Sequence, residues 1–268
     1  MKTKIAIIGA GNLGTSLVKG LLNSGKYQPS DFILTRRDTS KLAAFKEQGF
    51  TINSNNQEAI LNANIIILAV LPQKIDTVLY EIAKTVTKEQ LVISLVSGVK
   101  VNQIQEKLSS EIPVLRAMPN TAIAIRESMT CIANNDQFKD RMEEVITLFE
   151  LVGETIIINE EQMTSATALC ACGIAFFLRA IRAASQGGNE IDFHASEALK
   201  MAAQTAKGAA CLLIANQSHP EDEIDKVTSP KGCTIAGLNE MEHNGFSSSF
   251  IKGITVSAKQ AKGLYLEN

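Results

Sequence analysis

A glycine-rich loop near the start of the chain constrains its fold more than any other feature. Four apolar residues, Ile5 to Ile8, run directly into Gly9, as in a buried parallel strand. The spacing Gly9-x-Gly11-x-x-Gly14 then opens an apolar-periodic stretch that predicts a helix. This motif between a strand and a helix is typical of a dinucleotide-binding fold, and the alternative is a purely structural glycine-rich turn.

If a dinucleotide binds here, each glycine has a separate structural role. Gly9 allows the tight turn, Gly11 lets backbone N–H groups approach a pyrophosphate, and Gly14 lets the helix pack closely on the strand. The anion would lie at the positive end of that helix. The expected pyrophosphate site consists of Gly9, Ala10, Gly11, Asn12, Leu13 and Gly14.

The second expected strand, residues 31–35, ends at a pair of arginines. Thr35 is followed by Arg36 and Arg37, where an NAD-specific fold usually places an acidic residue for the ribose 2′-hydroxyl. Guanidinium groups suit a 2′-phosphate, because each charge-assisted hydrogen bond contributes about 1.5–3 kcal/mol. We therefore expect NADPH as the cofactor, with NADH weaker. The alternative is an exposed helix start with Asp38 as its N-cap.

Strand-like and helical segments alternate up to about residue 120. Residues 65–70 are the most strand-like, and residues 91–94 and 114–121 follow the same pattern. The alternation predicts an α/β fold, with a Rossmann-type doubly wound parallel sheet whose ligand crevice lies at the carboxyl ends of the strands. Further strands and a helix are expected at one sheet edge, over residues 129–133, 155–158 and 136–151.

The pattern changes near residue 161, where long alanine-rich helical stretches replace the strands. We therefore expect two domains, a cofactor-binding domain over 1–160 and an all-helical domain over 161–268. The small apolar faces of 172–186 and 195–215 predict pairing with another subunit. Helices are expected over residues 161–169, 172–186, 195–215, 221–227, 234–243 and 247–265.

Composition excludes several classes of function. The chain has 268 residues, of which 45% are hydrophobic and 20% charged, and a net charge of −2, so neither nucleic acid nor an anionic membrane is expected as a partner. The longest apolar run, residues 166–178, is shorter than the roughly 20 residues of a membrane span, and we expect a core helix there. Met1 to Lys4 leads straight into the first strand, so we expect no signal peptide. The cysteines, interpreted as reduced thiols, indicate a cytoplasmic protein.

The cysteines and histidines show no spacing typical of a catalytic or metal-binding site. The five cysteines include no C-x-x-C pair, so we expect reduced thiols and no metal site. Cys170 and Cys172 are only two residues apart, a spacing that indicates packing. The three histidines, His194, His219 and His243, are expected as helix caps or surface residues.

The loop over residues 225–238 is the informative stretch of the second half. Ser229-Pro230, then Gly232, then Thr234 and an apolar helix make a helix start with several free backbone N–H groups, which can hold a carboxylate. The alternative is a capped turn between helices.

With this loop, the chain resembles the pyrroline-5-carboxylate reductases from end to end. The most specific part is Val227-Thr228-Ser229-Pro230 with Gly232 and Thr234. The other residues that carry the resemblance are Gly9 to Gly14, Leu71-Pro72-Gln73, Ser97-Gly98, Arg116 to Thr121 and Ala203-Gln204-Thr205. The resemblance implies a Rossmann domain, a helical dimerisation domain, and reduction of the cyclic imine of proline biosynthesis by NAD(P)H. It also implies a homodimer, and in many members a ring of dimers.

The resemblance assigns roles to single residues. Thr234 is the expected catalytic residue, with its hydroxyl on the ring nitrogen. The substrate carboxylate would be held by Ser229, Gly232, Cys233 and Thr234, mostly through backbone N–H groups. The cofactor site would include Asn56, Val70, Leu71, Pro72 and Ser97, besides Thr35, Arg36 and Arg37 and the glycine loop.

The chain also departs from the family pattern. Leu71 stands where the family usually has Lys, Ala171 to Ala175 replace a Gly-Ser-Gly-Pro-Ala run, and Lys231 and Cys233 replace Gly and Thr. Two alternatives follow: an NADPH-dependent reductase of a related imine or keto acid, or a catalytically silent NADP-binding dimer. A β-hydroxyacid dehydrogenase is disfavoured, because its Lys-x-x-x-Asn motif is missing.

Overall fold

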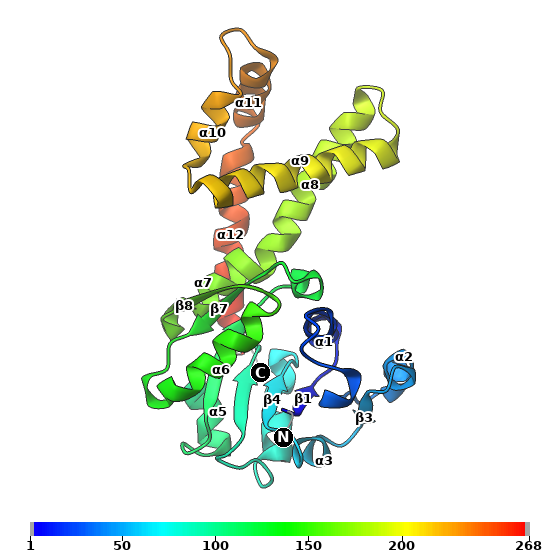
Figure 1. The fold of residues 1–268 in the computed structure, drawn as a ribbon. Coiled ribbons are helices and arrows are strands. Elements are labelled where there is room, and N and C mark those ends of the chain that lie inside the picture. Colours follow the sequence, from blue (N-terminus) through cyan, green and yellow to red (C-terminus); the bar gives the residue numbers. More distant parts are fainter. Residues whose placement is uncertain (1–2, 266–268) are drawn as a thin grey trace. The chain divides into compact units, whose positions relative to one another are not determined.

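The computed structural model describes residues 3–265, and the chain divides into two compact units (Figure 1). Met1–Cys172 together with Ser257–Asn268 form one, which we call the sheet unit. Gly173–Val256 form the other, the helical unit. Each unit is described by itself below.

One eight-stranded sheet forms the centre of the sheet unit, in the order β3-β2-β1-β4-β5-β6-β7-β8. Strands β1 to β6 are parallel in the order of a Rossmann fold, β7 runs antiparallel to β6, and β8 is parallel to β7. The predicted doubly wound sheet is confirmed, whereas the short β3 was not predicted. The strands are β1 (Ile5–Ile8), β2 (Phe32–Thr35), β3 (Thr51–Asn53), β4 (Ile65–Leu68), β5 (Leu91–Ser94), β6 (Val114–Met118), β7 (Ser128–Ala133) and β8 (Gly153–Ile158).

Helices cover both faces of this sheet. Ile7 of β1 packs in one apolar cluster with Leu17 of α1, while the neighbouring Ile8 packs on the opposite face with Leu79 of α4. Because both faces are buried, the strands are continuous apolar runs without alternation. The helices are α1 (Asn12–Asn23), α2 (Ala43–Glu47) and α6 (Lys139–Glu150) on the first face, and α3 (Asn56–Ile60), α4 (Ile75–Ile82) and α5 (Val101–Leu108) on the second.

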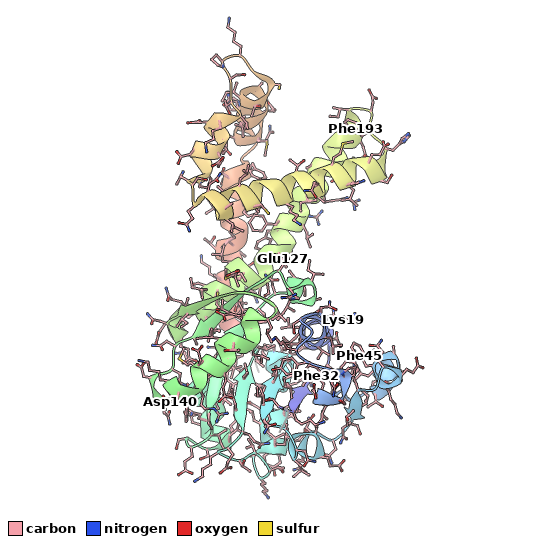
Figure 2. The ribbon with its side chains drawn as sticks, viewed as in Figure 1. Lys19, Phe32, Phe45, Glu127, Asp140 and Phe193 are labelled. Carbon is pink, nitrogen blue, oxygen red and sulfur yellow. The ribbon has the colours of Figure 1, made fainter. Side chains whose placement is uncertain are left out.

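An aromatic cluster closes the outer end of the first face. The ring centroids of Phe32 in β2 and Phe50 are 5.9 Å apart, and those of Phe45 in α2 and Phe50 are 5.3 Å apart. Figure 2 labels Phe32 and Phe45. These ring pairs bury large apolar area and fix α2 beside the sheet edge.

A buried ion pair links three segments at the other end of the unit. Arg116 of β6 donates from Nη1 to Glu160 Oε1 over 3.1 Å, and the backbone N–H of Val101 donates to the same oxygen over 2.7 Å. Burial lowers the pKa of the Arg116 guanidinium, while its hydrogen bond to Glu160 opposes the shift. The start of the second half of the chain is thereby held against β6 and α5.

The helix that leads into the helical unit is continuous. A π-helical turn over Thr167–Cys172 joins α7 (Met163–Ala166) to α8 (Gly173–Glu190), where the sequence predicted two separate helices. Over Glu160–Glu190 this stretch is long and apolar enough to cross a membrane by length and composition alone, and only 17% of the apolar window is buried. The expected core helix is therefore largely exposed in the single chain.

The helical unit contains α8, α9 (Ala195–Asn216), α10 (Pro220–Lys226), α11 (Cys233–His243) and most of α12 (Phe246–Gly263). The helices expected here are confirmed, and α12 begins one residue earlier than predicted, after Gly245 at φ 76. Helices α8 and α9 form a close hairpin, because a Cβ at Gly188 would lie 2.9 Å from Ala198 Cβ. Their connection carries Phe193, which is 42% exposed (Figure 2).

Histidines occupy helix ends, as predicted. His194 is the N-cap residue of α9, and His219 is that of α10, where its Nδ1 accepts a hydrogen bond from the backbone N–H of Glu221 over 3.2 Å. His243 is the last residue of α11. Of the three, His219 caps its helix through the side chain.

Candidate active site

The glycine loop between β1 and α1 adopts the tight turn that its sequence predicts. Gly9 has φ 94, and a Cβ there would lie 2.6 Å from Val70 Cγ1 and 2.8 Å from the carbonyl oxygen of Ala69. A Cβ at Gly14 would lie 2.9 Å from the carbonyl oxygen of Gly9. Both positions therefore exclude any side chain, Gly9 by backbone conformation and Gly14 by close packing.

Gly11 is the N-cap residue of α1 and faces open space. The nearest atom to a Cβ at this position is the carbonyl oxygen of Gly9, at 4.0 Å. Among the described residues, the first-turn N–H groups of Asn12, Leu13 and Gly14 have no backbone acceptor. An uncapped helix start with this much space fits a pyrophosphate, which the N–H groups and the helix dipole both attract.

A cavity of about 310 Å³ opens beside this loop, at the carboxyl ends of β1, β2 and β4. It contains eight of the predicted cofactor residues. These are Gly9, Gly11, Thr35, Arg36, Arg37, Asn56, Val70 and Leu71, and the cavity is also lined by Ile8, Ser54, Ala69, Lys74, Thr77, Val78 and Glu81. The remaining predicted cofactor residues, Ala10, Asn12, Leu13, Gly14, Pro72 and Ser97, are not among its lining residues.

The end of β2 is held against the glycine loop. Thr35 is buried, its Oγ1 accepts from the Gly9 N–H over 3.3 Å, and its carbonyl oxygen accepts from the Ala10 N–H over 2.8 Å. Arg36 Nη1 donates to the Ala10 carbonyl oxygen over 3.1 Å. Arg36 is thus fixed beside the loop.

Arg37 faces the same cavity, and among the described residues it has no hydrogen bond or ion pair. Its guanidinium is free to receive an anion. Asp38 accepts from the Ser40 N–H over 3.2 Å and so caps the next turn. The two interpretations of this segment are therefore compatible: the arginines line the cavity while Asp38 acts as a cap.

Sequence reasoning missed two charged residues of the cavity, Lys74 and Glu81. Lys74 ends a 3₁₀ turn, Pro72–Lys74, that begins four residues after the end of β4, and adds a third cation to the lining. Glu81 of α4 accepts a 2.6 Å hydrogen bond from Asn56 Nδ2. The position of Lys74 just beyond a strand end was a usable signal, whereas Glu81 reaches the cavity from a helix 25 residues after Asn56.

Ser97 lies at the end of the neighbouring strand β5. Its Oγ donates to Met118 Sδ over 3.9 Å, which joins the carboxyl ends of β5 and β6. Asn120 follows Met118 closely and caps the next 3₁₀ turn, because its Oδ1 accepts from the Ala122 N–H over 2.9 Å. The carboxyl edge of the sheet is therefore continuous from the glycine loop to Asn120.

The predicted substrate residues lie in the helical unit, around the start of α11. Gly232 is the N-cap residue, its N–H donates to the Ser229 carbonyl oxygen over 2.9 Å, and a Cβ there would lie 2.5 Å from Ser229 Oγ. Within the described part of the chain, the N–H groups of Cys233, Thr234 and Ile235 have no backbone acceptor. Such a group of N–H donors can bind a carboxylate.

Lys231 occupies the most unusual position of this loop. Its φ is 60, in the left-handed region where a side chain is disfavoured. The turn therefore has the geometry of a glycine although the chain carries lysine there.

The structure gathers the cofactor residues in one unit and the substrate residues in the other. A Rossmann-ordered sheet with an uncapped glycine loop, a cationic cavity and an attached helical unit defines a two-part, dinucleotide-binding oxidoreductase. Two family models agree with this division. Residues 4–98 match NADP oxidoreductase, coenzyme F420-dependent, and residues 160–264 match pyrroline-5-carboxylate reductase dimerisation.

Relatives of known name cover nearly the whole chain. Pyrroline-5-carboxylate reductase 2 of Dictyostelium discoideum is 48% identical over 96% of this chain and 91% of its own length. Pyrroline-5-carboxylate reductase 1 of the same organism is also 48% identical, but this chain spans only half of its length. Pyrroline-5-carboxylate reductase of Pisum sativum is 30% identical over 97% of this chain and 95% of its own.

Solved structures show the same fold. The pyrroline-5-carboxylate reductase of Coxiella burnetii has a TM-score of 0.85 at 30% identity and covers 98% of this chain and 99% of its own. Plasmodium falciparum pyrroline carboxylate reductase, solved with NADP bound, has a TM-score of 0.88 at 23% identity, with 98% of both chains covered. The chain belongs to the pyrroline-5-carboxylate reductase family.

Proposed function

We propose that this chain reduces the cyclic imine 1-pyrroline-5-carboxylate to L-proline, the last step of proline biosynthesis, with NADPH as the hydride donor. Relatives that carry the reductase name over nearly their full length support the substrate. The observation in this structure that carries the proposal is the cavity beside the glycine loop, in which two arginines stand at the end of β2.

Bound NADPH supplies the hydride, and a protonated imine is already electrophilic. The task of the protein is therefore positioning, with the imine carbon held about 3–3.5 Å from the donor carbon. Arg36 and Arg37 hold the 2′-phosphate, with Lys74 as a third cation. The free N–H groups of Asn12 and Leu13 hold the pyrophosphate.

The start of α11 holds the substrate in this proposal. The N–H groups of Cys233 and Thr234 donate to the carboxylate, beside Ser229 and Gly232. The Thr234 hydroxyl oxygen accepts the N–H of the protonated ring nitrogen and so orients the ring. This assignment is supported by the N–H groups themselves, which have no backbone acceptor within the described part of the chain.

The active form in this proposal is a homodimer in the cytoplasm, paired through the helical unit, with a ring of dimers as a further level of assembly. The match of residues 160–264 to a dimerisation domain supports the dimer. So do the large apolar side chains that α8 and α9 leave exposed, such as Leu178 at 59% and Ile214 at 77%. Subcellular fractionation tests the location.

The deciding experiment is NADPH oxidation by the purified protein with 1-pyrroline-5-carboxylate, followed by absorbance, with proline quantified as product. Saturable turnover with one proline per NADPH supports the proposal. Gly11→Asp is the matched control: its side chain has room, so the fold is kept, but its carboxylate repels the pyrophosphate and abolishes NADPH binding.

A second candidate is reduction of a related imine or keto acid. The observation that favours it is the altered substrate loop, with Lys231 at φ 60 and Cys233 as the first residue of α11. Turnover on the six-membered imine or on small keto acids, in the absence of turnover on the five-membered imine, would select this candidate. NADPH binding without turnover on any of them would indicate a silent dimer.

A further inference from the structure

Two cysteines far apart in the sequence lie in contact inside the sheet unit. The Sγ atoms of Cys131, on β7, and Cys170, in the π-helical turn, are 3.7 Å apart. Both residues belong to the same compact unit, so their geometry does not depend on where the helical unit lies. Sulfur atoms at this distance share a hydrogen bond, and one sulfur can reach the other with a small side-chain movement.

The two thiols differ in environment. Cys131 is 4% exposed and packs in an apolar cluster with Met118 and Met163, whereas Cys170 is half-buried at the border of that cluster. A reagent from solvent therefore reaches Cys170 first.

Their hydrogen bond also makes them chemically unequal. The hydrogen bond with Cys131 lowers the pKa of the Cys170 thiol to about 7, and partial burial opposes this shift. The same hydrogen bond, with burial and charge repulsion in addition, raises the pKa of Cys131. The lowered pKa and the greater exposure both favour Cys170 as the residue that carries the thiolate, the reactive form of cysteine.

Cys172 is not an equivalent partner for Cys170. It lies two residues along the same helical segment, and side chains at that spacing do not face each other. Burial raises the pKa of the Cys172 thiol, so it is less reactive than Cys170. The other two cysteines, Cys211 and Cys233, are exposed in the helical unit.

We propose that Cys131 and Cys170 form an oxidisable dithiol site that reacts with hydroperoxides and closes to an intramolecular disulfide. Cys170 is the attacking residue and Cys131 the resolving residue. The cross-link joins β7 to the last turn of the sheet unit before α8 begins.

The chemistry balances with one hydroperoxide. The Cys170 thiolate attacks a peroxide oxygen, the O–O bond breaks, and a sulfenic acid forms while the other oxygen leaves and takes up a proton. Loss of the thiolate removes the hydrogen bond that holds the proton on Cys131. Cys131 sulfur then attacks the sulfenic sulfur, the S–S bond forms, the S–O bond breaks, and the hydroxyl leaves with the Cys131 proton as water. Two thiols lose two electrons, and the peroxide gains them.

The dithiol site is connected by a hydrogen bond to the carboxyl edge of the sheet. The Cys170 carbonyl oxygen accepts a 3.3 Å hydrogen bond from Asn120 Nδ2. Asn120 lies two residues after Met118, which contacts Ser97. A disulfide between Cys131 and Cys170 would therefore restrain the backbone at Cys170, which accepts the hydrogen bond from Asn120.

The test uses the full-length, reduced protein treated with hydrogen peroxide in small molar excess. We expect a loss of 2 Da per chain in intact mass, a non-reducing peptide map that links Cys131 to Cys170, and full reversal by dithiothreitol. Cys172→Ser is the matched control and should cross-link at a rate within about twofold of wild type, because Cys172 takes no part.

Single variants separate the two roles. In Cys131→Ala the sulfenic acid on Cys170 has no partner, so dimedone should trap it there. In Cys170→Ser the 2 Da loss should disappear. Circular dichroism of each variant checks its fold, and Cys131→Ser is the second variant if Cys131→Ala does not fold.

Three results would overturn the proposal. One is a cross-link that maps to Cys170 and Cys172, or to two chains through Cys211 or Cys233. Another is direct oxidation of Cys170 to sulfinic acid without any cross-link. The third is an unchanged mass in wild type at a hundredfold excess of peroxide.

Discussion

The two units of this chain differ in how far their apolar side chains are buried. In the sheet unit, the central strands β1 and β4 are buried on both faces, and three apolar clusters fill the space between sheet and helices. In the helical unit, Gly173, Ser185 and Ala198 are the only buried residues, while Phe177 is 59% exposed.

This difference in burial indicates what stabilises each unit. The sheet unit carries a complete core, so burial within one chain stabilises it. The helical unit has apolar faces without a core, and such faces require a second surface. The match to a dimerisation domain supports the proposal that this surface is another copy of the same unit. Five variants probe the contrast.

The largest effect is expected in the sheet-unit core. Ile67 of β4 is fully buried, and Ile67→Ala should lower the free energy of unfolding by about 2–5 kcal/mol, since it leaves a cavity between packed layers. Urea denaturation at fixed protein concentration measures this. Leu61→Ala, at a residue that is 64% exposed, is the control and should change stability by less than about 0.5 kcal/mol. An equal loss of stability in the two variants would contradict a complete core in the sheet unit.

The next effect is expected in assembly. Leu178→Glu places a charge on an apolar face of α8 and should weaken the dimer about a hundredfold, or about 3 kcal/mol, because the charge is desolvated on pairing. Analytical ultracentrifugation measures the dimer dissociation constant. Tyr80→Glu is the matched control in the sheet unit, where Tyr80 is 82% exposed. If it weakened the dimer as much, the interface would not be confined to the helical unit.

Cofactor choice should depend on the sheet unit alone. The double variant Arg36→Ala/Arg37→Ala should raise the Kd of NADPH about a hundredfold and leave that of NADH nearly unchanged, because only NADPH carries the 2′-phosphate. Fluorescence titration with both nucleotides measures this. Lys41→Ala is the control, since Lys41 is exposed and outside the cavity lining. An unchanged preference would remove the arginines from the phosphate site.

Turnover should depend on the helical unit. Thr234→Ala should lower kcat about ten- to a hundredfold, through loss of one hydrogen bond to a charged ring nitrogen, with NADPH binding intact. Thr234→Ser keeps the hydroxyl and should retain most activity. Steady-state kinetics and nucleotide titration separate the two quantities. Wild-type kinetics in Thr234→Ala would exclude this residue from catalysis.

The smallest effect concerns the backbone of the substrate loop. Lys231→Gly should stabilise the protein by about 1 kcal/mol or less, because glycine adopts φ 60 without steric cost. Thermal unfolding of the dimer at fixed concentration measures the gain. Lys231→Ala keeps a Cβ and should show no such gain. A destabilised Lys231→Gly would mean that the lysine side chain supplies a contact that outweighs the strain.

The parts of the molecule that sequence predicted well are local in the chain. The strands were predictable because burial on both faces gives continuous apolar runs, as in residues 65–68. The glycine loop and Arg36 and Arg37 were predictable because their roles follow from distance to a strand end. The start of α11 was recognisable from its spacing of serine, glycine and threonine.

The parts that sequence missed depend on contacts between distant segments. Lys74 and Glu81 line the cavity together only because of how the 3₁₀ turn Pro72–Lys74 and α4 follow β4. The pairing of Cys131 with Cys170 requires β7 and the π-helical turn to pack together, and the sequence gives no sign of that contact between residues 39 positions apart. Residues 166–178 were expected in a core, but the apolar window of this helix is only 17% buried within the single chain, and the proposed dimer would cover it.

The two edges of the sheet differ in length. At one edge, β3 is three residues long and offers little for another strand to pair with. At the other, β8 has six residues, and Ile156 and Ile157 are about half exposed. Unpaired backbone groups beside isoleucine side chains are a template for strand addition, so β8 is the place where aggregation of the concentrated or partly unfolded protein would begin.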